Sequence, residues 1–188
     1  MIRVMRKLAL LLLLLNCACS GPWTKVGGLY EAPSHNFSVV VPQGWKKFNT
    51  DKYFLITKDD PFLHYILIQQ ISIERPFKHT KKRIKRGMLS QEVAEVIIDE
   101  ISCDQSLTDF EVVENIPVKI NSYDGFKLVF NYRMKNNLSH KTIYYGFLTN
   151  SYFYSIRYNT SEEQHADKDR ESFEKILNSF KLTEKRPV

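Results

Sequence analysis

Hydrophobic and polar residues alternate with a period of two along much of the chain after residue 36. Seven stretches show this pattern, or a short run rich in β-branched and aromatic residues: 37–41, 53–58, 63–74, 110–120, 126–135, 141–149 and 152–159. Both alternating sets of the 63–74 stretch carry bulky apolar residues, which is typical of a central strand covered on both faces. The pattern predicts one β-sheet of about six to seven strands.

The strands between residues 110 and 159 follow one another through the short connections NSYDG, NNLSH and TNS. Short turns join neighbouring antiparallel strands, so this half is predicted to be a meander with one face on the core. Near the start, Pro42 to Gly44 are expected to end the first strand in a turn. The Tyr-rich hairpin at 144–158 has two interpretations: packing on the sheet, or an exposed recognition surface.

Two segments change to the helical period. Residues 90–103 place apolar side chains at i, i+3, i+4 and i+8, with Ser90 as the expected N-cap, and residues 161–181 do so at i, i+3, i+4 and i+7. The apolar positions are Val93, Val96, Ile97 and Ile101 in the first helix and Phe173, Ile176, Leu177 and Phe180 in the second. An antiparallel sheet covered by a mid-chain helix and a C-terminal helix is an α+β fold.

The first residues match a secretory signal. Arg3, Arg6 and Lys7 precede the eight apolar residues Leu8–Leu15, as the cationic and apolar regions of a signal peptide require. Eight residues are too few for a helix across the bilayer, which needs about 20. Residues 1–16 are therefore interpreted as a lipoprotein signal peptide and not as a transmembrane anchor.

A cysteine directly after a short apolar run resembles the bacterial lipobox, which implies that the thiol is acylated and becomes the new N-terminus. Cys17 has Leu14 three positions before it but Asn16 beside it, whereas Cys19 has Ala18 beside it but Asn16 in place of leucine. Cys17 is the preferred lipidation site and Cys19 the alternative. An ordinary signal peptide cleaved near Ala18 is the competing interpretation.

Lipidation would anchor the protein to the membrane and place it in the bacterial cell envelope. The next residue is not Asp, which favours an outer-membrane protein facing the periplasm. The GP, GG and AP pairs predict a flexible tether over 17–35, then one domain over 36–182 and a disordered tail over 183–188. Cys103 is expected to be buried and inert, with a disulfide to Cys19 as the alternative.

The positive charge is concentrated in one segment. Of 27 basic residues three lie in the leader, so the rest of the chain carries 24 bases against 21 acids. Six of those 24 fall within nine residues: Lys78, Lys81, Lys82, Arg83, Lys85 and Arg86. This basic segment is either a solvated connection or a contact for anionic headgroups or another polyanion. No aromatic residue interleaves the bases, so nucleic acid is not an expected partner.

The sequence lacks the usual patterns of catalytic and metal sites. The five histidines, His35, His64, His79, His140 and His165, have no metal-ligand spacing. No GxSxG motif or phosphate-binding glycine loop is present. We expect no catalytic residue, no metal and no cofactor, and an unidentified envelope protein as the partner. The alternative is a periplasmic hydrolase whose site is assembled from residues distant in the sequence.

The run FSVVVPQGW at residues 37–45, followed by paired strands, a mid-chain helix, a meander and a C-terminal helix ending in SFKL, resembles the PsbP-like and DcrB-like proteins. The resemblance covers about residues 36–182. It implies an α/β/α sandwich and a largely non-catalytic role, since members of this group include photosystem-associated lumenal proteins, bacterial lipoproteins and small accessory factors. It implies no shared catalytic residue.

Overall fold

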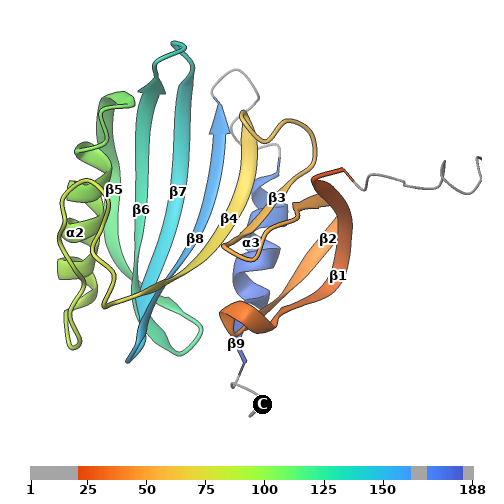
Figure 1. Cartoon of the computed structure of the whole chain (residues 1–188), viewed down its shortest axis with the longest axis horizontal. Coiled ribbons are helices and arrows are strands. Elements are labelled where there is room, and N and C mark those ends of the chain that lie inside the picture. The colour runs from red at the N-terminus through yellow and green to blue at the C-terminus, as the bar shows by residue number, and fades with distance from the viewer. Residues whose placement is uncertain (1–20, 162–168, 184–188) are drawn as a thin grey trace, which may run out of the picture.

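The computed structural model describes residues 21–161 and 169–183 and has nine strands in one antiparallel sheet (Figure 1). The strands are β1 (Trp23–Ala32), β2 (Phe37–Phe48), β3 (Phe54–Thr57), β4 (His64–Ser72), β5 (Leu107–Ile120), β6 (Tyr123–Met134), β7 (Ser139–Leu148), β8 (Tyr152–Ser161) and β9 (Lys181–Leu182). The helices are the short 3-10 helix η2 (Pro33–His35), α2 (Ser90–Ser102) and α3 (Arg170–Ser179). The α+β prediction is confirmed, and the strand count is nine instead of six to seven.

The sheet order is β1-β2-β3-β4-β8-β7-β6-β5, with β9 paired to the start of β2. β4 is therefore a central strand, as its two apolar faces indicated. The meander β5–β8 also forms as predicted, through antiparallel pairs. The prediction that only one of its faces lies on the core is wrong: Tyr154 and Phe153 point to opposite faces of β8, and both are buried.

The predicted tether is wrong for residues 23–35, which form β1 and η2. β1 pairs with β2 over almost its whole length, and the pairing slips between Val26 and Gly28, opposite Pro42–Gly44. Gly28 and Gly44 both have positive φ, which glycine adopts readily and other residues rarely do. The Gly and Pro residues therefore build a bulge within a hairpin, and β2 continues through the turn that the sequence predicted.

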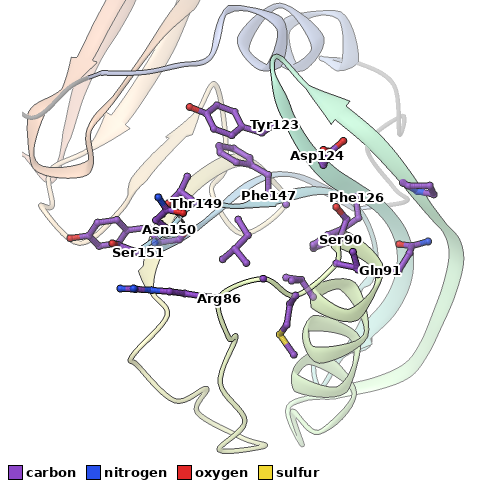
Figure 2. Close-up of a pocket in the computed structure, with 18 of the residues that line it drawn as sticks. Arg86, Ser90, Gln91, Tyr123, Asp124, Phe126, Phe147, Thr149, Asn150 and Ser151 are labelled. Carbon is purple, nitrogen blue, oxygen red and sulfur yellow. Dashed lines mark hydrogen bonds between the residues drawn. The ribbon is translucent and has the colours of Figure 1, made fainter.

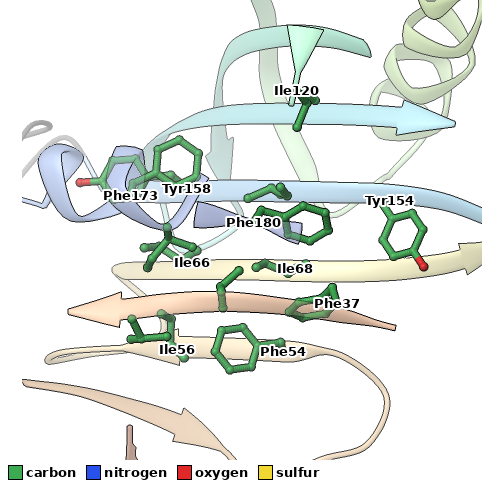
Figure 3. Packing of buried hydrophobic residues seen from close by; sticks show 14 of the residues in the cluster. Phe37, Phe54, Ile56, Ile66, Ile68, Ile120, Tyr154, Tyr158, Phe173 and Phe180 are labelled. Atoms are coloured by element: carbon green, nitrogen blue, oxygen red, sulfur yellow. The ribbon is translucent and has the colours of Figure 1, made fainter. Parts of the chain in front are cut away.

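Each helix covers one face of the sheet. Phe173 and Ile176 of α3 are buried against β2 and β8. Figure 3 shows Phe173 beside Tyr158, and Phe180 next to both Tyr154 and Phe37. Ring centroids are 5.3 Å apart for Phe173–Tyr158 and for Phe37–Phe180. This face holds the larger of the two cores.

Helix α2 covers the other face, over β5, β6 and β7. Its buried residues are Val93, Ala94, Val96 and Ile97, which pack on Phe126, Leu128 and Phe130 of β6. Leu89, not Ser90, occupies the N-cap position, and Glu92 Oε2 accepts the Leu89 N–H at 2.7 Å. The three layers form the sandwich that the resemblance implied.

Candidate functional site

A cleft of about 1090 Å³ lies where the N-terminal end of α2 meets the β5–β6 turn and the β7–β8 turn. These two turns lie at the same end of the sheet because alternate connections of a meander do so. Leu182 of β9 closes one side. The volume is slightly above the roughly 300–1,000 Å³ typical of small-molecule sites.

The floor of the cleft is apolar and its rim is polar. Phe126, Gly146 and Phe147 line it and are buried, with Phe126 on the α2 face of the sheet and Phe147 on the α3 face. Figure 2 shows Arg86, Asn150 and Ser151 on one side and Gln91 with Asp124 on the other. An apolar floor with a polar rim is the usual composition of a surface that binds another molecule.

Gly146 lines the cleft and lies in close contact with two buried aromatic rings. A Cβ at this position would meet the rings of Phe126 and Phe153, both fully buried. These rings are held by stacking, with centroids 6.1 Å apart, so they cannot move aside easily. A glycine is required here by the close approach of the ring and not by the backbone, since its φ is not positive.

The cleft has few groups that could catalyse a reaction. Of the described residues that line it, Asp124 is the only carboxylate and none is a histidine or cysteine. Asp124 pairs with Lys119 at 2.7 Å. An acid–base pair or an activated nucleophile is therefore absent from this lining, and the cleft is suited to binding.

The basic segment runs along α2 with all six bases exposed. Ile84 is buried beneath it, and Glu100 of α2 accepts the N–H groups of His79 and Thr80 at 2.9 Å each. Lys82 pairs with Asp99, and no other base of the segment lies within 4 Å of a carboxylate among the described residues. Arg86, the last base, reaches the cleft.

A second, smaller pocket of about 240 Å³ lies at the other end of α2. His79, Glu100 and Asp104 stand at this pocket, which is the combination expected of a hydrolase. His79 Nε2 lies 3.6 Å from Asp104 Oδ2, longer than a hydrogen bond.

Both carboxylates of that pocket are occupied by structural hydrogen bonds. Burial raises the pKa of Glu100, but the Thr80 and His79 bonds outweigh it and leave the pKa below its usual value. The same balance, with bonds from the Ser106 N–H and hydroxyl, lowers the pKa of Asp104. Carboxylates with lowered pKa values are poor general acids, so this geometry does not favour the hydrolase alternative.

Another histidine–carboxylate pair is buried near the start of α3. His64 Nε2 lies 3.7 Å from Asp169 Oδ2, and both side chains are about 4% exposed. Lys58 pairs with the other oxygen of Asp169. Neither the cleft nor the smaller pocket includes these residues in its lining, so we assign the pair a structural role.

The cysteines and the remaining predictions are placed as follows. Cys103 is exposed and free, so the expectation that it is buried is wrong; it follows the last turn of α2, beyond the buried stripe. Cys17 and Cys19 lie outside the described residues, as do His165 and the tail after residue 183.

Within 21–161 and 169–183, no three His, Cys, Asp or Glu side chains are arranged to hold a metal, and no helix is long and apolar enough to cross a membrane.

Comparison of the fold with solved structures gives extensive matches at low sequence identity. The cyanobacterial PsbP of Synechocystis sp. PCC 6803 matches with a TM-score of 0.55 and 10% identity, covering 89% of this chain and 97% of that one. The fold is PsbP-like. A Mog1 variant matches with a TM-score of 0.54 and 11% identity, over 86% and 96% of the two chains.

Two further matches come from other bacteria. LpqN of Mycobacterium tuberculosis, described as involved in cell envelope biogenesis, has a TM-score of 0.54 and 12% identity over 86% of this chain and 91% of that one. A Bacteroides thetaiotaomicron VPI-5482 structure has a TM-score of 0.53 and 14% identity. The match covers 84% of this chain but only about half, 49%, of the length of that chain. No protein family description and no curated protein matches the sequence.

Proposed function

We propose that this protein is a lipid-anchored, non-catalytic module of the bacterial cell envelope that binds a partner protein through the cleft at the N-terminal end of α2. The observation that carries the proposal is the lining of the cleft, whose buried aromatic floor and polar rim suit binding and whose described residues include no acid–base pair. The likeness to LpqN, whose description names cell envelope biogenesis, supports the envelope setting.

The anchor would hold the domain close to the membrane. Because β1 begins at Trp23, five residues separate it from Cys17. The connection from Cys17 to Trp23 can then span at most about 20 Å, at roughly 3.3–3.6 Å per residue. The domain would therefore lie next to the bilayer with its β1 edge near the anchor, while α2 lies at the opposite edge of the sheet (Figure 1).

Lipidation is tested by metabolic labelling of the full chain with a fatty acid. We expect the label to be lost in Cys17→Ala and retained in Cys19→Ala. The reverse result would move the acylated residue to Cys19. Label that persists in the double substitution would disprove the anchor, and so would the absence of label from the unaltered chain.

Partner binding is tested by filling the cleft. Asn150 is an exposed turn residue that lines the cleft, and Asn136 is an exposed turn residue in the β6–β7 connection at the other end of the sheet. Crosslinked envelopes should yield a defined partner with the unaltered chain and with Asn136→Trp, and a loss of about tenfold or more with Asn150→Trp. Equal capture by the two variants would exclude the cleft as the binding surface.

A second candidate function is binding to a polyanion or to anionic headgroups through the basic segment. It is favoured by the exposure of all six bases, each worth about 1 kcal/mol near an anionic surface. In a Cys17→Ser/Cys19→Ser chain, sedimentation with anionic vesicles should fall when the six bases are replaced by glutamine. Equal sedimentation of both chains, or equal sedimentation with neutral vesicles, would exclude this function.

A further inference from the structure

Arg157 of β8 is a half-buried positive charge at the smaller pocket. It pairs with Leu67 of β4 and Tyr144 of β7 in the sheet, and it lines the pocket at the C-terminal end of α2. Its guanidinium carbon lies 5.3 Å from the centre of the Tyr144 ring. Its Nε is buried without a hydrogen-bond acceptor, and no carboxylate lies within 4 Å of it among the described residues.

A buried charge of this kind is costly. A guanidinium that has lost part of its hydration is normally paired with a carboxylate or with several acceptors. Stacking on Tyr144 offsets part of the cost, by about 0.5–2 kcal/mol in general, but leaves the Nε–H without an acceptor. The arrangement therefore indicates an anionic group that enters the pocket from outside.

Three hydroxyl-bearing side chains share this pocket with the Arg157 guanidinium. Tyr65, Tyr132 and Thr142 line the same pocket; Tyr132 and Thr142 donate to Asn159 Oδ1 at 2.9 and 2.8 Å. Burial raises the pKa of both tyrosines, so their hydroxyls stay protonated near neutral pH. Because Tyr132 and Thr142 give their single hydroxyl protons to Asn159, the Tyr65 hydroxyl and the positively charged Arg157 guanidinium are the donors that this part of the lining offers to an oxyanion.

The acidic residues that line the pocket limit which anion fits. Glu100 and Asp104 carry negative charge there, and His79 stands beside them. A dianion such as phosphate would meet these two like charges with twice the repulsion of a monoanion, whereas a planar carboxylate carries one charge and matches the guanidinium fork in two parallel hydrogen bonds. The volume of about 240 Å³ is below that of a drug-sized site and admits a small molecule or one terminal residue.

We infer that this pocket is a carboxylate-binding site in which Arg157 pairs with the carboxylate of a small organic acid or of a peptide C-terminus. Ile101, Leu107 and Phe130 line the same pocket and would contact the apolar part of the ligand. The site is separate from the cleft, because the two sets of lining residues share no member.

The test follows the Arg157 Nε–H signal in the full chain, labelled with ¹⁵N-arginine in detergent. Sodium butyrate, trialanine, trialanine amide and inorganic phosphate are titrated separately at constant ionic strength. Butyrate or trialanine should shift the signal saturably, while the amide and phosphate should not. Saturation by trialanine alone identifies a peptide C-terminus, and saturation by butyrate alone identifies a free acid.

The matched variants are Arg157→Met, which keeps the aliphatic stem, and Arg133→Met, which removes an exposed arginine of β6. Affinity, followed by ligand-induced thermal shift, should fall at least about tenfold in Arg157→Met, or about 1.4 kcal/mol, and remain unchanged in Arg133→Met. If Arg157→Met does not fold, the inference is tested by the titration of the unaltered chain and by Tyr65→Phe. The affinity of Tyr65→Phe for the carboxylate is expected to be several-fold weaker than that of the unaltered chain. The inference is overturned if no carboxylate saturates the signal, if phosphate binds as tightly, or if folded Arg157→Met binds equally well.

Discussion

Helices α2 and α3 cover opposite faces of one sheet, and they differ in what their packing leaves open. On the α3 side Phe173, Ile176 and Phe180 close tightly on the rings of Tyr158 and Phe37. Both pockets lie at the ends of α2, with Ser90 and Gln91 lining the cleft and Glu100 and Ile101 the smaller pocket. The cleft also extends past the end of the sheet to Phe147 and Leu182, which pack in the α3-side core. No residue of α3 lines either of them.

The difference teaches that stability and binding are separated in this molecule. The α3 face contributes a continuous aromatic core, which stabilises the fold because its rings are packed without gaps. The α2 face combines a smaller apolar core with polar residues that are only half covered, such as Tyr65 and Arg157. Substitutions on the first face should therefore change stability, and those around the second should change binding more than stability.

The largest effect is expected for Phe173→Ala. Phe173 is 1% exposed and stacks on Tyr158, so its removal leaves a cavity at the centre of the α3 face. The free energy of unfolding should fall by about 3–5 kcal/mol, measured by guanidinium denaturation. Phe62→Ala, at a position 79% exposed, is the control and should change it by less than about 0.5 kcal/mol. A similar small change in both variants would contradict the distinction between the faces.

A smaller loss of stability is expected for Gly146→Ala. The added methyl group would press on the rings of Phe126 and Phe153 under the cleft, and overpacking of this kind costs about 1–3 kcal/mol. Gly21→Ala is the matched control, because nothing lies within 4 Å of the position of its Cβ. Calorimetric melting of both variants checks the prediction; an unchanged melting temperature in Gly146→Ala would show that the floor is not tightly packed.

These residues also show how far the sequence determines the fold. The 3.6-residue stripe of α2 and the period-two strands β3 to β8 were predicted at nearly their observed positions, because each buries one or both faces in a regular register. The C-terminal helix was predicted to begin at residue 161, but Ser161 ends β8 and α3 begins at Arg170. β1 was not predicted because its pairing with β2 is interrupted by a bulge, where Gly28 has a positive φ and lies near Pro42 of β2. Locally such residues have the composition of a loop, and only pairing with β2 makes them a strand.

The candidate sites were less predictable. The connections NSYDG and TNS were recognised as turns, and alternate turns of a meander share one end, so the position of the cleft was implicit in the strand order. The close approach of the Phe126 ring to Gly146 in the lining was not, because it arises from the packing of side chains across neighbouring strands. Arg157 gave no signal at all: it is a single arginine in a strand of alternating residues, and its lack of a carboxylate is a fact of packing alone.

A third prediction concerns the connection between α2 and the basic segment. Glu100→Gln should lower the free energy of unfolding by about 1 kcal/mol, since the carboxylate accepts the N–H groups of His79 and Thr80 and the Thr80 hydroxyl. Because these bonds leave the pKa of Glu100 below its usual value, its contribution is complete above that usual value and is lost as the pH falls through the lowered pKa.

Denaturation of the Glu100→Gln and Glu111→Gln chains between neutral and acidic pH checks this prediction. Glu111 is an exposed residue of β5 and serves as the control. The difference between Glu100→Gln and the unaltered chain should disappear at the acidic end. A difference that grows on acidification would contradict the assigned role of Glu100.

The smallest effect on stability is expected at two leucines with nearly equal exposure, of which one should also affect binding. Leu89 stands at the cleft and is 70% exposed, whereas Leu29 lies on β1 and is 68% exposed. Leu89→Ser and Leu29→Ser should each change the free energy of unfolding by less than about 0.5 kcal/mol, because neither side chain is removed from a core. Only Leu89→Ser should weaken retention of the partner, since truncating an apolar contact in an interface commonly costs about 1 kcal/mol or more. Equal retention by the two variants would show that exposure of an apolar residue at the end of α2 is incidental to binding.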